Sequence, residues 1–303
     1  MNSSTQIKSL NNQILDLRKV GIIYNTEHSG AEQVAGKLEQ LFNNRGIITE
    51  KQALSADRKH DGVAYLCDIT FAVVIGGDGS LLGAARFYAK SDIPIFGINV
   101  GRLGFLAQLN PHDLEEGIEK IFNGQFKVEE RLMLKAYDKS ESPAENHEFE
   151  LSALNDIVIK GGTVSRTARL YLYINGKHVC DYLADGLIIS TPTGSTAYTL
   201  SAGGPVLVPG LNAMVIVPIC PHSLTTRPLV IPESEEITVK TCSNCELIYL
   251  TADGQENIEL KDNNSIFIKQ YEKKAKLILL EKENNGFYSV LREKLHWGLS
   301  PKG

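Results

Sequence analysis

The residues most suited to chemistry form a few short stretches, and the first is Gly76–Ser80, which reads Gly-Gly-Asp-Gly-Ser. It follows a continuous apolar run, Phe71–Ile75, and precedes a segment with helical spacing. Glycines let a ligand approach the backbone closely, and N–H groups at a helix start receive phosphate oxygens. Asp78 adds a carboxylate that can hold a metal ion or accept a proton from an attacking hydroxyl. An ordinary Asp-Gly turn is the alternative, but two glycines directly after a buried strand favour a ligand-binding loop. The stretch is neither a P-loop nor a G-x-G-x-x-G fingerprint.

The second stretch, residues 183–205, is a strand-like apolar segment that runs into a loop rich in hydroxyl groups and glycine. Such a loop offers many neutral donors, and Tyr198 adds an aromatic ring for a ribose or a base. A solvated connection of the same composition is the alternative. The length of the loop, and the presence of Asp185 and Tyr198 on its flanks, favour a binding loop.

The elements that must position these stretches differ between the two halves of the chain. The first ~125 residues alternate apolar strands with helical patterns, which predicts a Rossmann-like parallel sheet covered by helices. The expected strands are 20–24, 71–75 and 95–98, and the expected helices are 29–42, 81–88 and one starting at Leu114. Asp113 and Glu116 have the spacing of a capping box for that last helix. Ligands bind at the carboxyl ends of strands in such sheets, which is where Asp78 falls.

After residue 126 the apolar residues alternate with a period of two, which predicts an antiparallel, all-β sandwich domain. The clearest segments are 169–174, 236–240, 265–269 and 276–280. Residues 288–297 again have helical spacing. We therefore expect an α/β domain over 1–125, a β-sandwich domain over 126–280, and a tail over 281–303 that packs back on the first domain.

The composition excludes several classes of function. The net charge of −5 argues against a nucleic-acid partner. There is no apolar run of 18 residues and no export signal, so we expect no membrane association. The five cysteines are odd in number and scattered, which favours a reducing, cytoplasmic location. Cys242 and Cys245 form a C-x-x-C, but no second pair completes a zinc site, so a hairpin turn is the simpler interpretation.

Taken together, these motifs resemble those of the NAD kinases. The matching stretches, in order, are Gly76–Gly79, Gly101–Phe105, Asn155–Asp156, Asp185–Gly186, Thr193–Tyr198, Pro221–Pro228 and Asp253–Gln255. Gly-Gly-Asp-Gly alone also occurs in diacylglycerol kinases, sphingosine kinases and phosphofructokinases. The Thr-Gly-Ser-Thr-Ala-Tyr loop in the right order makes the resemblance specific.

The resemblance implies roles for individual residues. Asp78 would accept the proton and contact the substrate's ribose, with Gly79 beside it, and Phe105 would contact the nucleotide. Asn155 and Asp156 would bind substrate hydroxyls or the adenine. The remaining implied contacts are Arg166 near phosphate, Asp185 at the nicotinamide end, Thr196, Ala197, Tyr198 and Ser201 along the dinucleotide groove, and Gln255 closing it.

Two positions depart from the family pattern. Asp156 stands where the family usually has glutamate, and Leu183 stands where some relatives have a basic residue. No metal ligand is implied among the protein's side chains.

The implied reaction moves the γ-phosphoryl group of ATP, or of polyphosphate in some members, to the 2′-hydroxyl of the adenosine ribose of NAD, giving NADP. Members use Mg²⁺ and form homodimers or homotetramers. A lipid kinase of the diacylglycerol type is one alternative, but it needs an acyl pocket or a basic amphipathic helix, which the sequence does not suggest. A non-enzymatic NADP(H)-binding sensor is another, but such a protein would be expected to lose the base at Asp78.

Overall fold

The computed structural model describes residues 5–54, 65–101, 104–138, 149–161, 167–241, 248–260, 265–281 and 286–296. By its internal packing the chain divides into two compact units. Residues 1–130 and 275–303 form the first, and residues 131–274 form the second. Arg166, Cys242 and Cys245 lie outside the described residues.

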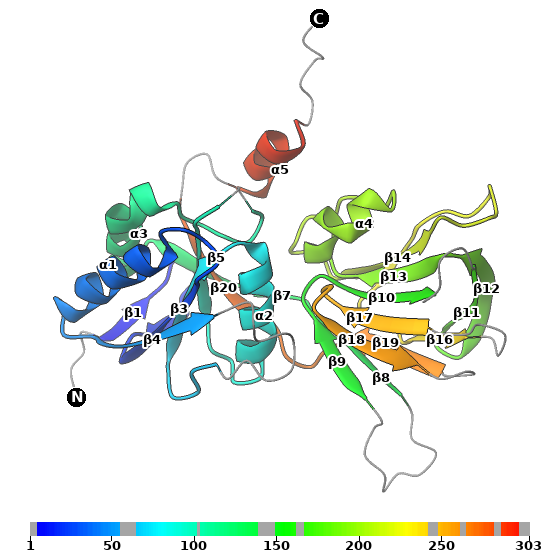
Figure 1. Cartoon of the computed structure of the whole chain (residues 1–303), viewed down its shortest axis with the longest axis horizontal. Helices are drawn as coiled ribbons and strands as arrows, with labels where there is room; N and C mark the ends of the chain where they lie inside the picture. The colour runs from blue at the N-terminus through cyan, green and yellow to red at the C-terminus, as the bar shows by residue number, and fades with distance from the viewer. Residues whose placement is uncertain are drawn as a thin grey trace, which may run out of the picture. The chain divides into compact units, whose positions relative to one another are not determined.

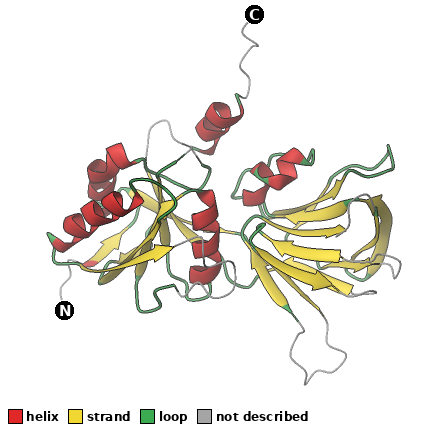
Figure 2. Ribbon diagram, viewed as in Figure 1, coloured by secondary structure: helices red, strands yellow, loops and turns green. Residues whose placement is uncertain are grey.

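The first unit is an α/β layer structure (Figures 1 and 2). Its sheet has the strand order β4-β3-β5-β6-β20-β7. Strands β3, β4, β5, β6 and β20 pair in parallel, as the strand and helix alternation predicted. The strands are β1 (Gln6–Lys8), β2 (Ile14–Asp16), β3 (Lys19–Asn25), β4 (Ile48–Leu54), β5 (Phe71–Gly76), β6 (Ile95–Asn99), β7 (Phe126–Arg131) and β20 (Ala275–Leu280). The helices are α1 (Ala31–Asn43), α2 (Asp78–Ala89), α3 (Leu114–Phe122) and α5 (Phe287–Leu295), with a 3₁₀ turn at Pro111–Asp113.

Helices cover both faces of this sheet. Side chains of α1 and α3 share one buried apolar cluster with alternate residues of the strands, including Val34, Ile118 and Val73. Figure 1 shows α2 on the opposite side of the sheet. Strand β5 is buried along its whole length, which accounts for its continuous apolar sequence.

The structure departs from the sequence pattern at the start of α3 and at β20. The capping box at Asp113 and Glu116 is wrong, because Asp113 ends a 3₁₀ turn with φ −97° and ψ 12° and its side chain makes no cap. That backbone conformation is not the extended one an N-cap side chain needs. The segment 276–280, whose alternation suggested the β-domain, forms β20 and pairs in parallel with β6 at Leu277 and Ile95.

The second unit is an antiparallel β-sandwich. One sheet has the order β15-β14-β13-β10-β17-β18 and the other β12-β11-β16-β19-β8-β9. The strands are β8 (Leu134–Asp138), β9 (Glu150–Ala153), β10 (Asp156–Gly161), β11 (Ala168–Ile174), β12 (Lys177–Ala184), β13 (Gly186–Ser190), β14 (Ala213–Ile219), β15 (Leu229–Pro232), β16 (Ile237–Thr241), β17 (Ile248–Ala252), β18 (Glu256–Leu260) and β19 (Ser265–Gln270). A 3₁₀ turn (Thr193–Thr196) and the short α4 (Tyr198–Ser201) follow β13.

The sandwich core fixes which side of each strand is available for a ligand. Alternate residues such as Ile157 and Ile159 of β10 and Leu250 of β17 are buried between the two sheets. Their neighbours in the sequence, such as Val158, Lys160 and Tyr249, therefore lie on the outer face of the first sheet.

Candidate active site

In the first unit, the Gly-Gly-Asp-Gly loop holds its carboxylate in a fixed orientation. Asp78 is the first residue of α2 and directly follows the end of β5 at Gly76 and the extended Gly77. The backbone N–H of Phe105 donates to Oδ2 of Asp78 at 3.0 Å, and that of Leu106 donates to Oδ1 at 3.3 Å. Two consecutive amides thus bind the carboxyl group, and the side chain of Asp78 is 31% exposed.

The glycines of this region leave room for side chains to approach. A Cβ at Gly104 would lie 2.0 Å from Oδ1 of Asp78, and one at Gly76 would lie 2.5 Å from Oγ of Ser80. The hydroxyl of Ser80 in turn accepts from Nδ2 of Asn25 at 3.2 Å. A side chain at Gly104 would therefore displace the carboxyl group of Asp78, and one at Gly76 would displace Ser80.

Two further side chains lie beside this loop, and the motif reading missed both. His28 follows β3, and a Cβ added at Gly77 or Gly101 would come within 3.7 Å of its ring. Lys294 of α5 places Nζ 3.7 Å from Oδ2 of Asp78. The signal for His28 was its place after a parallel strand that neighbours β5. No local motif marks Lys294.

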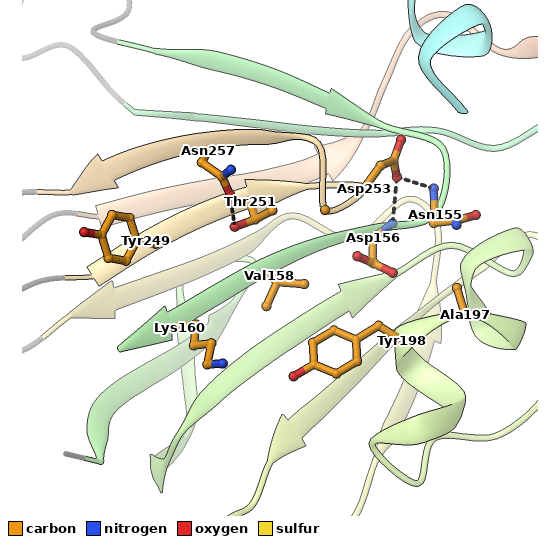
Figure 3. A pocket seen from close by; sticks show the side chains of 11 residues that line it. Asn155, Asp156, Val158, Lys160, Ala197, Tyr198, Tyr249, Thr251, Asp253 and Asn257 are labelled. Carbon is orange, nitrogen blue, oxygen red and sulfur yellow. Dashed lines mark hydrogen bonds between the residues drawn. The ribbon is translucent and has the colours of Figure 1, made fainter. Parts of the chain in front are cut away.

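In the second unit, the Asn155-Asp156 turn is held by Asp253 (Figure 3). The carboxylate of Asp253 accepts three backbone hydrogen bonds, from the N–H groups of Leu154 at 3.0 Å, Asn155 at 2.7 Å and Asp156 at 3.2 Å. Asp253 and Gly254 both have positive φ, 51° and 65°, in the three-residue connection between β17 and β18, where the N–H of Gln255 donates to the carbonyl of Ala252 at 2.9 Å and closes a tight turn. The Asp-Gly turn therefore shapes the loop that presents Asn155.

The residues of the hydroxyl-rich loop that follows β13 fall into a buried group and an accessible group. Ser190, Thr191 and Ser195 are fully buried, and their hydroxyl groups donate to backbone carbonyls. Oγ1 of Thr191 donates to the carbonyl of Leu154 at 2.6 Å, and Oγ of Ser195 donates to that of Pro192 at 2.6 Å. Ser190 and Thr191 therefore tie the loop to the Asn155 turn, and Ser195 holds the loop's own backbone. Thr196 and Ala197 are half-buried, and Tyr198 and Ser201 are exposed, so these four remain accessible to a ligand.

A cavity of about 610 Å³ opens on the outer face of the first sheet of the sandwich. Of the residues singled out from the sequence, it is lined by Asn155, Asp156, Ala197 and Tyr198. Figure 3 shows Tyr198 facing Val158 and Lys160 of β10 across this space. Asp253 and Gly254, from the Asp253–Gln255 stretch, also line it, and the lining that sequence reasoning missed is Val158, Lys160, Tyr249, Thr251 and Asn257. Alternation along β10 and β17 was the signal that could have found most of them.

Asp156 is the buried acid of this cavity. Its exposure is 4%. Burial, and to a lesser degree the charge of Asp253, raises the pKa of Asp156 to about 7. Near neutral pH the carboxyl is therefore protonated in part of the molecules and can donate a hydrogen bond as well as accept one.

Two other predicted residues, Asp185 and Gln255, lie in the second unit but outside the lining of this cavity. Asp185 is exposed at the turn between β12 and β13, where its carbonyl accepts the N–H of Gly161 at 3.1 Å. Gly161 lies at the opposite end of β10 from Asn155, about 20 Å away at the usual rise of an extended strand. Gln255 follows the Asp253 turn and is half-buried.

The chain resembles known proteins over nearly its full length. The ATP-NAD kinase N-terminal domain family matches residues 20–126, and the ATP-NAD kinase C-terminal domain family matches residues 154–280. The chain is 39% identical to an NAD kinase of Moorella thermoacetica over 93% of this chain and 90% of the relative. It is 38% identical to an NAD kinase of Geobacter metallireducens over 93% of this chain and 99% of the relative.

Solved structures share the fold. A yeast NADH kinase complexed with NADH superposes with a TM-score of 0.82 at 22% identity, over 100% of this chain and 97% of that chain. An NAD kinase from Archaeoglobus fulgidus in complex with ATP gives 0.69 at 26% identity, over 90% of this chain and 98% of that chain.

The α/β unit with its carboxylate loop, the β-sandwich with its cavity and the two family matches together place the chain among the phosphotransferases. The chain belongs to the NAD kinase family. This assignment disfavours the lipid-kinase alternative.

Proposed function

We propose that the chain transfers the γ-phosphoryl group of ATP to the 2′-hydroxyl of the adenosine ribose of NAD, giving NADP and ADP. The observation that carries this proposal is the orientation of Asp78, which two backbone amides hold at the end of β5. The names of the relatives support the substrates, since these proteins are NAD kinases and the Archaeoglobus structure is described as a complex with ATP.

In this reaction Asp78 takes the proton of the ribose hydroxyl. The hydroxyl oxygen forms a bond to the γ-phosphorus, and the bond from that phosphorus to the bridging oxygen breaks, so that ADP leaves. A positioned base contributes roughly 10²–10⁴-fold to such a step. The start of α2, where Gly79 lies, favours the negative charge of the phosphates.

The dinucleotide would use the cavity and loop of the second unit. Asn155 and Asp156 would bind ribose hydroxyls or the adenine, and Tyr198 would contact the base or ribose with its ring. Thr196, Ala197 and Ser201 would line the groove. Asp185 would meet the nicotinamide end, at a distance along β10 that suits a long ligand. Phe105, Arg166 and Gln255 stay proposals as nucleotide contacts on the strength of the family pattern.

Mg²⁺ would enter with the nucleotide. Among the described residues no three His, Cys, Asp or Glu side chains gather as a metal site. Mg²⁺ is usually bound through one or two carboxylates and the substrate's phosphates, and Asp78 is the half-buried carboxylate at this loop. When bound, the ion would neutralise charge on the triphosphate.

Location and assembly complete the proposal. No helix within the described ranges is long and apolar enough to cross a membrane. The scattered cysteines support a cytoplasmic location, and Cys67, Cys180 and Cys220 are free thiols. We propose a homodimer or homotetramer, as in the family, which sedimentation of the purified chain would test.

The function is tested by a coupled assay in which an NADP-specific dehydrogenase reports product. NAD or NADH, Mg²⁺ and either ATP or polyphosphate are supplied, and labelled diacylglycerol replaces the dinucleotide in a parallel reaction. Formation of NADP with ATP supports the proposal. A chain that binds NADP without turnover would instead be a sensor, and a labelled phospholipid product would identify a lipid kinase.

A further inference from the structure

The C-terminal helix α5 brings a cation to the Asp78 loop. Nζ of Lys294 lies 3.7 Å from Oδ2 of Asp78 and 4.7 Å from the ring centre of Phe105. The ring of Phe287, at the other end of α5, lies 6.2 Å from the ring of Phe105. Both ends of the helix therefore contact one residue, Phe105, whose backbone amide also binds the carboxylate.

The two oxygens of Asp78 have different surroundings. Oδ2 accepts the N–H of Phe105 at 3.0 Å and faces Lys294. Among the described residues, Oδ1 has one hydrogen-bond partner, the N–H of Leu106 at 3.3 Å. A carboxylate has about four acceptor positions, two on each oxygen. Oδ1 thus keeps the capacity to accept a proton from a substrate hydroxyl.

We propose that Lys294 is a positioning residue for phosphoryl transfer, which holds Oδ2 of Asp78 so that Oδ1 faces the ribose hydroxyl. The inference rests on the proposed function and deepens it. The side chains of Lys294 and Asp78 are 37% and 31% exposed, and ion pairs with such exposure contribute little to folding stability. The contact is therefore expected to affect the orientation of the carboxylate much more than the stability of the unit.

Orientation matters for rate because a reacting group displaced by about 1 Å can lower the rate about 10²-fold. In Lys294→Met, the amides of Phe105 and Leu106 still bind the carboxyl group, but Oδ2 loses its charged neighbour, so the orientation of the carboxyl group is fixed less firmly. The ring of Phe105, whose backbone amide binds Asp78, also loses its contact with the Lys294 ammonium group. The loss should appear in kcat, because Lys294 acts on the base and not on the bound substrates.

The experiment measures kcat, the KM for NAD and the KM for ATP of the full chain, together with the melting temperature. Lys294→Met should lower kcat by about 10-fold to 100-fold with both KM values and the melting temperature close to wild type. Lys294→Arg should restore most of the rate. The matched control is Arg292→Met, which removes the same charge from an exposed position on the same helix. Residues two apart on a helix do not share a face, so this control should keep the wild-type kcat.

The double variant Asp78→Asn/Lys294→Met decides whether Lys294 acts through Asp78. Residues that act as one unit have non-additive effects, so the double variant should be no slower than Asp78→Asn alone. Multiplied losses, an unchanged kcat in Lys294→Met, or an effect confined to the KM for ATP would overturn the positioning role. A wild-type enzyme that forms no NADP would instead refute the proposed function, and with it this role.

Discussion

Replacing Asp156 by asparagine is expected to remove one step from the pH dependence of folding stability. Burial beside Asp253 raises the pKa of Asp156 to about 7 from an ordinary value of 3.8. Between these two values the folded protein binds more protons than the unfolded chain. The free energy of unfolding therefore falls as the pH rises through this window. The stabilising effect of the proton is fully present below the lower value and is lost as the pH passes about 7.

The magnitude follows from the width of the window. One proton changes the free energy of unfolding by about 1.4 kcal/mol per pH unit. From pH 5 to pH 8, where most other carboxyl groups are already ionised, the wild-type protein should lose about 3 kcal/mol through Asp156. Asparagine is close in shape to a protonated aspartic acid but does not titrate, so Asp156→Asn should lack this loss.

Urea unfolding of both proteins at pH 5, 6, 7 and 8 gives the measurement. The histidines titrate in the same range, but they are common to both proteins and cancel in the difference between them. The variant should gain stability relative to the wild type as the pH rises. Parallel stability profiles would refute the assignment of a raised pKa to Asp156.

Three further predictions follow from the geometry of the two loops. Asp78→Asn should lower kcat at least about 10²-fold while calorimetry finds NAD affinity unchanged, and near-normal turnover would remove Asp78 from the role of base. Gly104→Ala should lower kcat by about 10-fold or more, because its Cβ would lie 2.0 Å from Oδ1 of Asp78. Gly36→Ala, where a Cβ meets nothing within 4 Å, is the matched control, and equal activity of the two variants would contradict the steric argument. Asp253→Ala should lower the free energy of unfolding by about 2–4 kcal/mol in urea titrations, since three amides lose their acceptor. Asp253→Asn, which tolerates the positive φ and keeps one acceptor oxygen, should lose less, and an equal loss would count against the hydrogen-bond account.

Much of the fold could be predicted because its strongest determinants are local. The fully apolar β5 signalled a strand buried on both faces, and the period-two segments signalled the sandwich. Strand β20 shows the limit of this reasoning, because its alternation says nothing about which sheet it joins. That choice depends on pairing with β6, far away in the sequence. The domain limits at 125 and 280 stay a prediction.

The residues of the candidate site could be predicted where they lie within a short sequence motif. Asp78, Asn155 and Tyr198 all came from short, ordered motifs. The motifs could not reveal that the hydroxyl groups of Ser190, Thr191 and Ser195 are already hydrogen-bonded within the protein. Those hydrogen bonds depend on how the loop folds and packs against Asn155.

The role of Lys294 and the hydrogen bonds of Asp253 could not be predicted, for a related reason. Each acts through a residue that is remote in the sequence, Asp78 for the first and Asn155 for the second. Such pairs are visible only once the chain is folded.

The most direct test of the account follows the phosphoryl group itself. Wild-type protein and Asp78→Asn are incubated with NAD, Mg²⁺ and ATP labelled in the γ-phosphate, and the labelled dinucleotide is identified by chromatography and mass spectrometry. The account predicts that the wild type places label on the 2′-position of the adenosine ribose and that Asp78→Asn does so at least about 10²-fold more slowly. Label on any other position, or equal rates in the two proteins, would contradict it.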